Sequence, residues 1–69
     1  MSFEVNGHRL RQLRVERALS LRALAQSSGA AFDTINKLEL SHRSARLTTI
    51  RKLAEALGVE PKELMKSVV

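Results

Sequence analysis

Two short amphipathic patterns with a single glycine, Gly29, between them occupy residues 21–40. Leu24 before the glycine, and Ile35 and Leu38 after it, fall at positions that predict one inward face on each of two helices. Glycine ends helices readily because it enters the left-handed conformation, which costs residues with a Cβ roughly 1 kcal/mol. We therefore expect the chain to turn sharply at Gly29 and to pack the two helices at a steep angle.

The 69 residues divide into five short helical patterns with tight connections, and none is typical of a strand. Helices are predicted over about residues 7–17, 21–28, 31–40 and 47–57, with a polar loop at 41–44 and a fifth helix beginning at Pro61. With two Phe and no Trp or Tyr, the core must consist of Leu, Ile, Val and Ala. The prediction is an all-α fold, a compact five-helix domain over residues 1–69.

Charge indicates the class of partner. Twelve Lys and Arg against seven Asp and Glu give a net charge of +5. Such an excess favours a polyanion, because each neutralised phosphate releases counterions. The alternative is a basic surface that serves only solubility.

Composition also bears on location and chemistry. The absence of Cys excludes disulfides and thiolate metal sites and fits a reducing cytoplasm. No apolar run approaches the ~20 residues of a membrane span, and residues 1–7 lack the pattern of a signal peptide. We expect a cytoplasmic protein with no membrane partner.

Most of the chain, from Gly7 to about Leu64, carries a recognisable series of motifs. They are GHRLRQLRVER at 7–17, LSLRALA at 19–25, TINKLE at 34–39 and IRKLAEALGV at 50–59. In this order the chain resembles the lambda-repressor-like (Cro-type or XRE-type) helix-turn-helix family, with the motif at about residues 21–40. The resemblance implies a bacterial or phage protein that acts at the nucleoid and inserts its third helix into the major groove of DNA.

The resemblance places four residues of the third helix against base edges: Phe32, Asp33, Asn36 and Lys37. Asn36 is suited to a bidentate contact with adenine, and Lys37 to donation to guanine O6 or N7. Phe32 offers an apolar contact to a thymine methyl, and Asp33 an acceptor for cytosine N4. The alternative for Asp33 is to stabilise the positive end of its own helix.

Other polar residues near the third helix are expected to hold DNA phosphates. The predicted set is Arg22, Thr34, Arg43 and Arg46, with Ser44 and His42 as weaker candidates. For each arginine the alternative is an ordinary solvated charge. Arg51, Lys52, Lys62 and Lys66 are expected to solvate the far side.

Two further residues that match the family are expected to be structural. Arg14 and Glu39 occupy the positions of a partly buried ion pair that ties the reading helix to the scaffold. The sequence departs from the family at Leu21, where a glutamine usually contacts phosphate, and at Ala18, where glycine is usual and a left-handed backbone would strain alanine.

These features predict a sequence-specific regulator of transcription that binds double-stranded DNA, acts as a repressor and forms a homodimer through the loop before the fourth helix and the C-terminal helix. No enzyme is expected, because no nucleophile and base share a recognisable spacing and His8 and His42 lie in polar contexts. No cofactor and no metal site are expected either.

A protein-interaction module is the alternative function. Some antitoxins are similar to this family and bind a toxin as well as DNA, and a missing effector domain is another conceivable protein partner. Phe32 on the reading helix and a C-terminal apolar group of Met65, Val68 and Val69 would suit a protein partner, unless the latter three complete the core. RNA binding lacks support, because there are no aromatic platforms for stacking bases.

Overall fold

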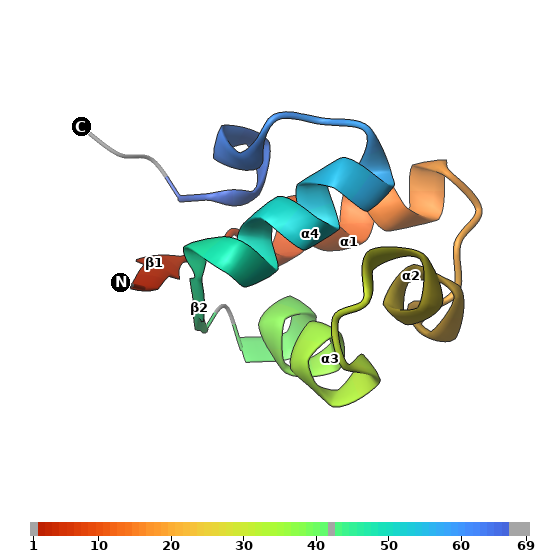
Figure 1. Cartoon of the computed structure of the whole chain (residues 1–69), viewed down its shortest axis with the longest axis horizontal. Helices are drawn as coiled ribbons and strands as arrows, with labels where there is room; N and C mark the ends of the chain where they lie inside the picture. Colours follow the sequence, from red (N-terminus) through yellow and green to blue (C-terminus); the bar gives the residue numbers. More distant parts are fainter. Residues whose placement is uncertain (1, 42, 67–69) are drawn as a thin grey trace.

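The fold was analysed in a computed structural model, which describes residues 2–41 and 43–66. This part of the chain contains four α-helices, two short strands and one 3-10 turn (Figure 1). The helices are α1 (Gly7–Glu16), α2 (Leu21–Ser28), α3 (Phe32–Ser41) and α4 (Leu47–Leu57), the strands are β1 (Ser2–Glu4) and β2 (Ser44–Arg46), and the turn is η1 (Pro61–Leu64). None of these helices combines the length and apolarity needed to cross a bilayer.

Local side-chain chemistry explains where the helices begin and end. Asn6 caps α1 by accepting a hydrogen bond from the backbone N–H of Arg9, and Ser20 caps α2 in the same way through Ala23. Gly29 follows α2 with a φ of 79°, and Gly58 follows α4 with a φ of 71°. The predicted helix end at Gly29 is confirmed, and Gly58 ends α4 in the same left-handed conformation.

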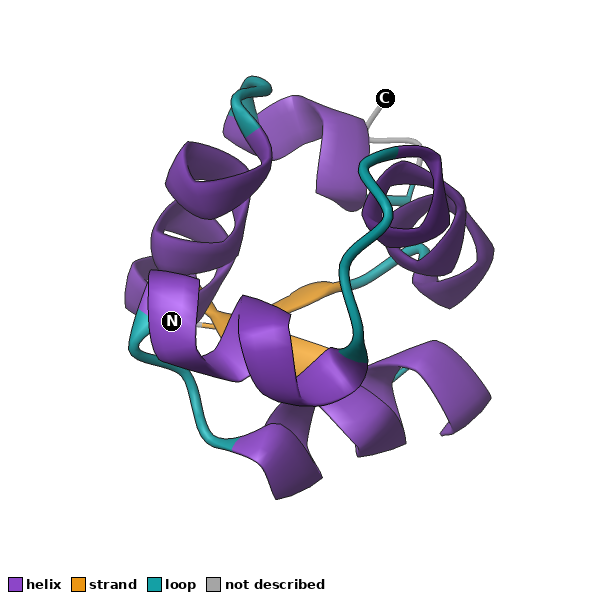
Figure 2. Cartoon of the chain, turned by 90° about the vertical axis from the view of Figure 1, so that its right-hand side faces the viewer, coloured by secondary structure: helices purple, strands orange, loops and turns teal. Residues whose placement is uncertain are grey.

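One aliphatic core joins the helices. Its buried side chains are Val5, Leu10, Leu13, Leu24, Ile35, Leu38, Ala45, Ile50, Leu53, Ala54, Leu57 and Leu64. Helix α3 packs against α1 and α2, while α4 packs against α2 and η1, so the four helices surround this core (Figures 1 and 2). The expected core of Leu, Ile, Val and Ala is confirmed, as are the inward positions on both sides of Gly29.

The prediction that no segment forms a strand was wrong. Strands β1 and β2 pair antiparallel, with Phe3 opposite Ala45 at the centre of the register (Figure 2). Each strand has only three residues, with one side chain turned inward, so the alternation is too short to identify from the sequence. The predicted loop at residues 41–44 therefore leads into a strand at Ser44.

The predicted fifth helix is only the single turn η1. Pro61 occupies its first turn, as expected, and Leu64 is buried in the core. The helix cannot continue because Met65 becomes extended and forms a β-bridge with Val5. Met65 itself is half-buried and packs against the core, whereas Val68 and Val69 lie outside the described residues.

The connection between α1 and α2 contains a strained residue. Ala18 has a φ of 54° and is the one non-glycine residue with positive φ in the described part of the chain. Alanine pays about 1–2 kcal/mol for this conformation, which glycine adopts freely.

Replacing Ala18 by glycine should therefore stabilise the protein. Glycine relieves the strain of about 1–2 kcal/mol, but it also gives the unfolded chain more conformational entropy, which costs about 0.4–1 kcal/mol. The difference should raise the free energy of unfolding of Ala18→Gly by about 0.5–1 kcal/mol. Thermal unfolding followed by circular dichroism measures the change. The control is Ala23→Gly inside α2, which should lower stability by about 1 kcal/mol. Equal melting of Ala18→Gly and the parent would contradict the argument.

Candidate nucleic-acid interface

The turn between α2 and α3 fixes how α3 is presented. The Gly29 N–H donates to Ala25 O at 2.9 Å, and the Ala30 N–H donates to Ser28 Oγ at 3.1 Å. Ile35 and Leu38 are buried, so these side chains anchor one face of α3 in the core. The opposite face of α3 lies at the edge of the molecule (Figure 1).

The four predicted base-facing residues share this outer part of α3. Phe32, Asp33 and Lys37 are exposed, and Asn36 is half-buried. The Lys37 ammonium lies 3.8 Å from Asp33 Oδ2, one turn away on the same helix. An exposed pair of this type contributes only about 0.3–0.5 kcal/mol, so Lys37 can exchange its partner for a base or a phosphate at little cost. The roles of the four residues in reading bases stay predictions.

The predicted phosphate-binding residues lie at both sides of α3. Arg22 belongs to the first turn of α2, and Thr34 is half-buried on α3 itself. Arg43 and Arg46 are exposed at the two ends of β2. In Figure 1, α3 lies between β2 on the left and α2 on the right, so the elements that carry these arginines lie on either side of α3. His42 lies outside the described residues.

Charge pairing distinguishes parts of the surface. Acidic side chains engage Arg9, Arg14, Arg17, Lys37 and Lys66 in ion pairs. Within residues 2–41 and 43–66, no ion pair is found for Arg22, Arg43 and Arg46 beside α3, nor for Arg11, Arg51, Lys52 and Lys62 elsewhere. The three arginines beside α3 can therefore meet a phosphate without first losing a carboxylate.

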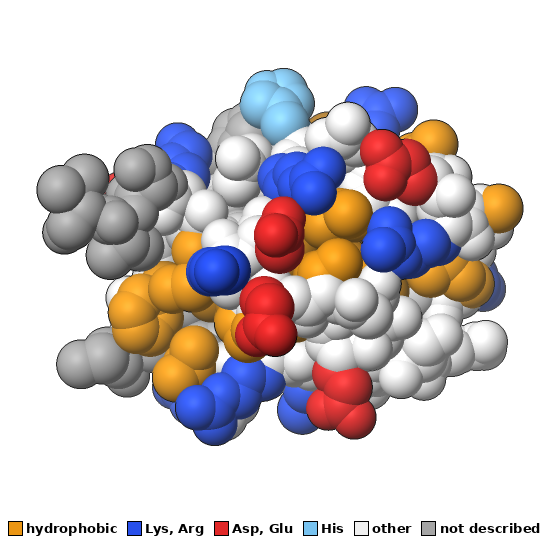
Figure 3. Space-filling view, turned by 90° about the horizontal axis from the view of Figure 1, so that it is seen from above, with side chains coloured by type: hydrophobic (Ala, Val, Ile, Leu, Met, Phe, Trp, Pro, Cys, Tyr) orange, Lys and Arg blue, Asp and Glu red, His pale blue; other side chains and the backbone are white. Residues whose placement is uncertain are grey.

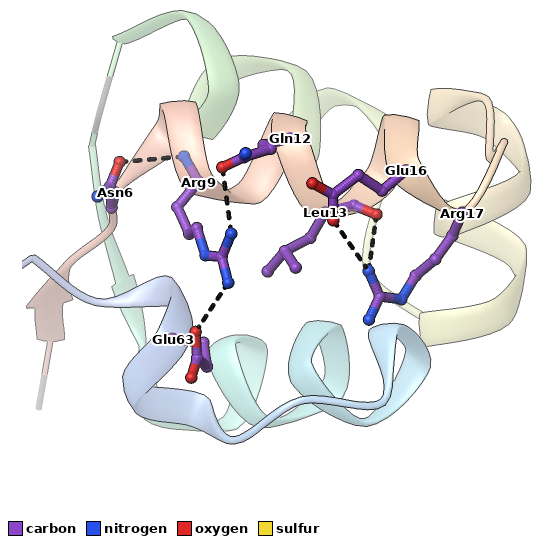
Figure 4. A network of polar contacts seen from close by, with 7 residues as sticks. All are labelled: Asn6, Arg9, Gln12, Leu13, Glu16, Arg17 and Glu63. Carbon is purple, nitrogen blue, oxygen red and sulfur yellow. Dashed lines mark hydrogen bonds and ion pairs between the residues drawn. The ribbon is translucent and has the colours of Figure 1, made fainter.

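The side of the molecule away from α3 carries charges of both signs. Figure 3 shows basic and acidic side chains intermingled on this face. Here Arg9 joins α1 to η1 by donating to Glu63 Oε1 at 3.1 Å, and it also donates to Gln12 (Figure 4). Arg17 donates to the carbonyl of Leu13 near the end of α1. A face of mixed sign is poorly suited to a continuous run of phosphates.

The N-terminal strand positions the two arginines of the β2 region. Val5 N–H donates to Arg43 O at 3.2 Å, and the register of the sheet pairs Ser2 with Arg46. The segment that carries both arginines is thus held by backbone hydrogen bonds from the start of the chain. Sequence reasoning missed this connection, because only the folded structure brings the two segments together.

Arg14 and Glu39 form a bidentate bridge between α1 and α3. Arg14 Nε lies 2.7 Å from Glu39 Oε2, and Arg14 Nη2 lies 3.0 Å from Glu39 Oε1. A third bond, from Arg14 Nη1 to Leu19 O at 2.8 Å, reaches the connection before α2. The hydrogen bond to Glu39 raises the pKa of the Arg14 guanidinium, the Glu39 charge acts in the same direction, and burial opposes both. The bridge therefore joins α3 to α1 and to the connection before α2.

Loss of this bridge should destabilise the protein. The side chains of Arg14 and Glu39 are only 13% and 5% exposed, so Arg14→Ala leaves a carboxylate without a partner in a nearly dry site. We expect a loss of about 2–4 kcal/mol, measured as the midpoint of denaturant unfolding.

Arg9→Ala is the matched control for that variant. It removes another α1 arginine, whose pair with Glu63 is 36% and 39% exposed and should contribute less than about 1 kcal/mol. If the two variants unfold at the same denaturant concentration, the Arg14 bridge does not stabilise the fold as argued.

Among the described residues no group of three or more His, Cys, Asp or Glu side chains could hold a metal ion. The outer part of α3 instead presents an amide, an ammonium group and an aromatic ring, and Arg22, Arg43 and Arg46 nearby in the chain have no ion pair within residues 2–41 and 43–66. Such groups recognise base edges and phosphates in the major groove.

The fold and this surface define a helix-turn-helix protein of the class that binds DNA and regulates transcription. The chain belongs to the helix-turn-helix family HTH_3, whose model matches residues 10–64, and the predicted membership of the XRE-type family is confirmed. The mostly helical fold is consistent with that family, although five helices are not found.

Solved structures and a curated relative agree with this assignment. The chain is similar to the restriction-modification controller protein C.AhdI from Aeromonas hydrophila, with 42% identity and a TM-score of 0.79 over 86% of this chain and 89% of that one. It is also similar to an HTH_3 family transcriptional regulator from Vibrio cholerae, with 30% identity and a TM-score of 0.76 over 83% of this chain.

A propionyl-CoA carboxylase regulator from Cereibacter sphaeroides is 34% identical over 61 residues, which are 88% of this chain. The chain spans only 13% of that regulator's length and 32% of the Vibrio protein. The likeness to these two therefore concerns the helix-turn-helix domain alone.

Proposed function

We propose that the protein recognises a specific sequence in double-stranded DNA by inserting α3 into the major groove, and that it represses transcription by occupying that site. The observation that carries this proposal is the division of α3 into two faces. Ile35 and Leu38 are buried, whereas Phe32 and Lys37 are exposed. A helix held from behind in this way can enter a groove about 12 Å wide without disturbing the core.

The base contacts follow from the chemistry of the outer face. Asn36 pairs with adenine through N6 and N7, and Lys37 donates to guanine O6 or N7. Phe32 meets a thymine methyl, and Asp33 either accepts from cytosine N4 or holds Lys37 until DNA arrives. Arg22, Thr34, Arg43 and Arg46 hold the phosphates on either side of the groove. These phosphate contacts set the register of α3, and the base contacts set the sequence.

Substitutions should separate base reading from phosphate binding. Asn36→Ala and Lys37→Ala should each cost about 1–3 kcal/mol on the preferred site and little on other duplexes. Arg43→Ala should weaken all duplexes alike and reduce the slope of log affinity against log salt by about 1. Selection from a random duplex pool supplies the preferred site, and binding isotherms at several salt concentrations supply the slopes. Identical behaviour of the two kinds of variant would refute these roles.

A homodimer is the proposed binding form. A single α3 reads only one half-site, whereas two copies related by a two-fold axis place two reading helices ~34 Å apart, one turn of DNA. We assign the dimer contact to the loop before α4 and to the C-terminal segment that contains η1.

The dimer has a direct test in solution. Sedimentation of the protein with a duplex carrying the selected site should give two protomers per duplex, and the site should be an inverted repeat with half-sites about 10 base pairs apart. One protomer per duplex at saturating protein, on a site without symmetry, would rule out dimeric binding.

The apolar side chains on α3 favour one second candidate function, an antitoxin-type module that also binds a partner protein. Leu40 is 71% exposed and Phe32 is 42% exposed, and both lie on the proposed reading helix. This function predicts that a second small protein co-purifies with the chain from its source and competes with DNA for α3. The Lys37→Ala variant would then keep the protein partner while losing base preference.

A further inference from the structure

A ring contact joins the two helices of the motif. The guanidinium carbon of Arg22, on α2, lies 6.0 Å from the centroid of the Phe32 ring, on α3. This distance is within the range of a cation–π contact. Building on the proposed function, we propose that Phe32 is a positioning residue for Arg22: its ring holds the guanidinium ready for a DNA phosphate. Phe32 then contributes to the binding of every duplex, beyond any contact with a thymine methyl.

The chemistry of guanidinium allows this double engagement. A cation–π contact engages the charge of the group with the face of the ring, and the ring offers no carboxylate or carbonyl oxygen to its five N–H donors. A phosphate is bound bidentately by donors in that plane. In the described part of the chain no carboxylate or carbonyl takes up the Arg22 donors, so the ring is the one partner found for this side chain.

A comparison with Lys37 shows how a carboxylate partner differs from a ring partner for a cation that binds DNA. The Asp33 carboxylate attracts the positive charge of the Lys37 ammonium, which is the charge that would also attract a DNA phosphate. That pair must open before Lys37 binds DNA. The Phe32 ring carries no net charge and offers no oxygen acceptor to the Arg22 donors, so the cation–π contact can persist in the complex. It also restricts a long side chain in advance, which lowers the entropy lost on binding.

The fold fixes the separation of the two partners. Arg22 and Phe32 lie on opposite sides of the Gly29 turn, and the buried side chains of Leu24 and Ile35 hold α2 and α3 together. The contact between Arg22 and the Phe32 ring is therefore a consequence of how the two helices pack. Because Phe32 is 42% exposed, its ring can face Arg22 and still reach solvent.

A double-mutant cycle on a duplex without the selected site tests the proposal, because base reading contributes little there. We expect Phe32→Leu to weaken this binding about two- to fivefold, the range of an exposed cation–π contact. In the Arg22→Ala background the same substitution should change the affinity no further. Phe32→Tyr keeps an aromatic ring and should therefore weaken binding less than Phe32→Leu does. Arg51→Ala, at an exposed arginine of α4 that is expected to lie on the far side from α3, controls for the loss of one positive charge.

A second measurement needs no DNA. In the free protein, side-chain proton resonances of Arg22 should carry a ring-current shift that Phe32→Leu abolishes and Phe32→Tyr retains. Thermal unfolding of each variant verifies that it is folded. The proposal is overturned if Phe32→Leu weakens binding by the same factor with and without Arg22, if it has no effect on the unselected duplex, or if the ring-current shift is absent. A parent protein that binds no duplex would overturn the proposed function as well.

Discussion

The burial of Ile35 and Leu38 is the constraint on which the rest of the interface depends. These two side chains determine which face of α3 points inward, and the left-handed turn at Gly29 determines the angle at which α3 leaves α2. Once both are fixed, every other residue of α3 has its direction assigned by the helical repeat. The outward position of Lys37 is therefore a consequence of core packing.

Electrostatic contacts reinforce this arrangement unequally. The Arg14–Glu39 bridge is nearly buried and makes three hydrogen bonds, so it joins α1, α3 and the connection before α2. The exposed pair of Asp33 with Lys37 holds its partners only weakly. The contact that orients α3 is therefore strong, whereas the contact on its exposed face can be exchanged for another partner.

Sequence reasoning predicted the elements whose signals are local. Helix α2 has the predicted bounds, and α3 is shifted by one residue, because glycine, a serine cap and helical spacing all act within a few positions. The strands and the early end of η1 depend on pairing between segments about 40 to 60 residues apart, such as Val5 with Met65, and no local pattern predicts them. Local helical spacing also predicts which residues of α3 face outward. The Arg22–Phe32 contact forms between two helices across the turn, so no local pattern predicts it.

The departure at the start of α2 now has a physical interpretation. Leu21 stands where the resemblance leads one to expect a glutamine that contacts phosphate, and in the structure it is half-buried against the core. Its contribution is packing, so the first turn of α2 loses a polar contact. The next residue, Arg22, offers a full charge beside an aromatic ring on α3. A cation held in this way can replace a neutral amide as the phosphate contact of α2, because charge-assisted hydrogen bonds are stronger than neutral ones. In the proposed binding mode, the Phe32 ring therefore has two effects: it makes the outer face of α3 less polar, and it positions the Arg22 guanidinium for a phosphate.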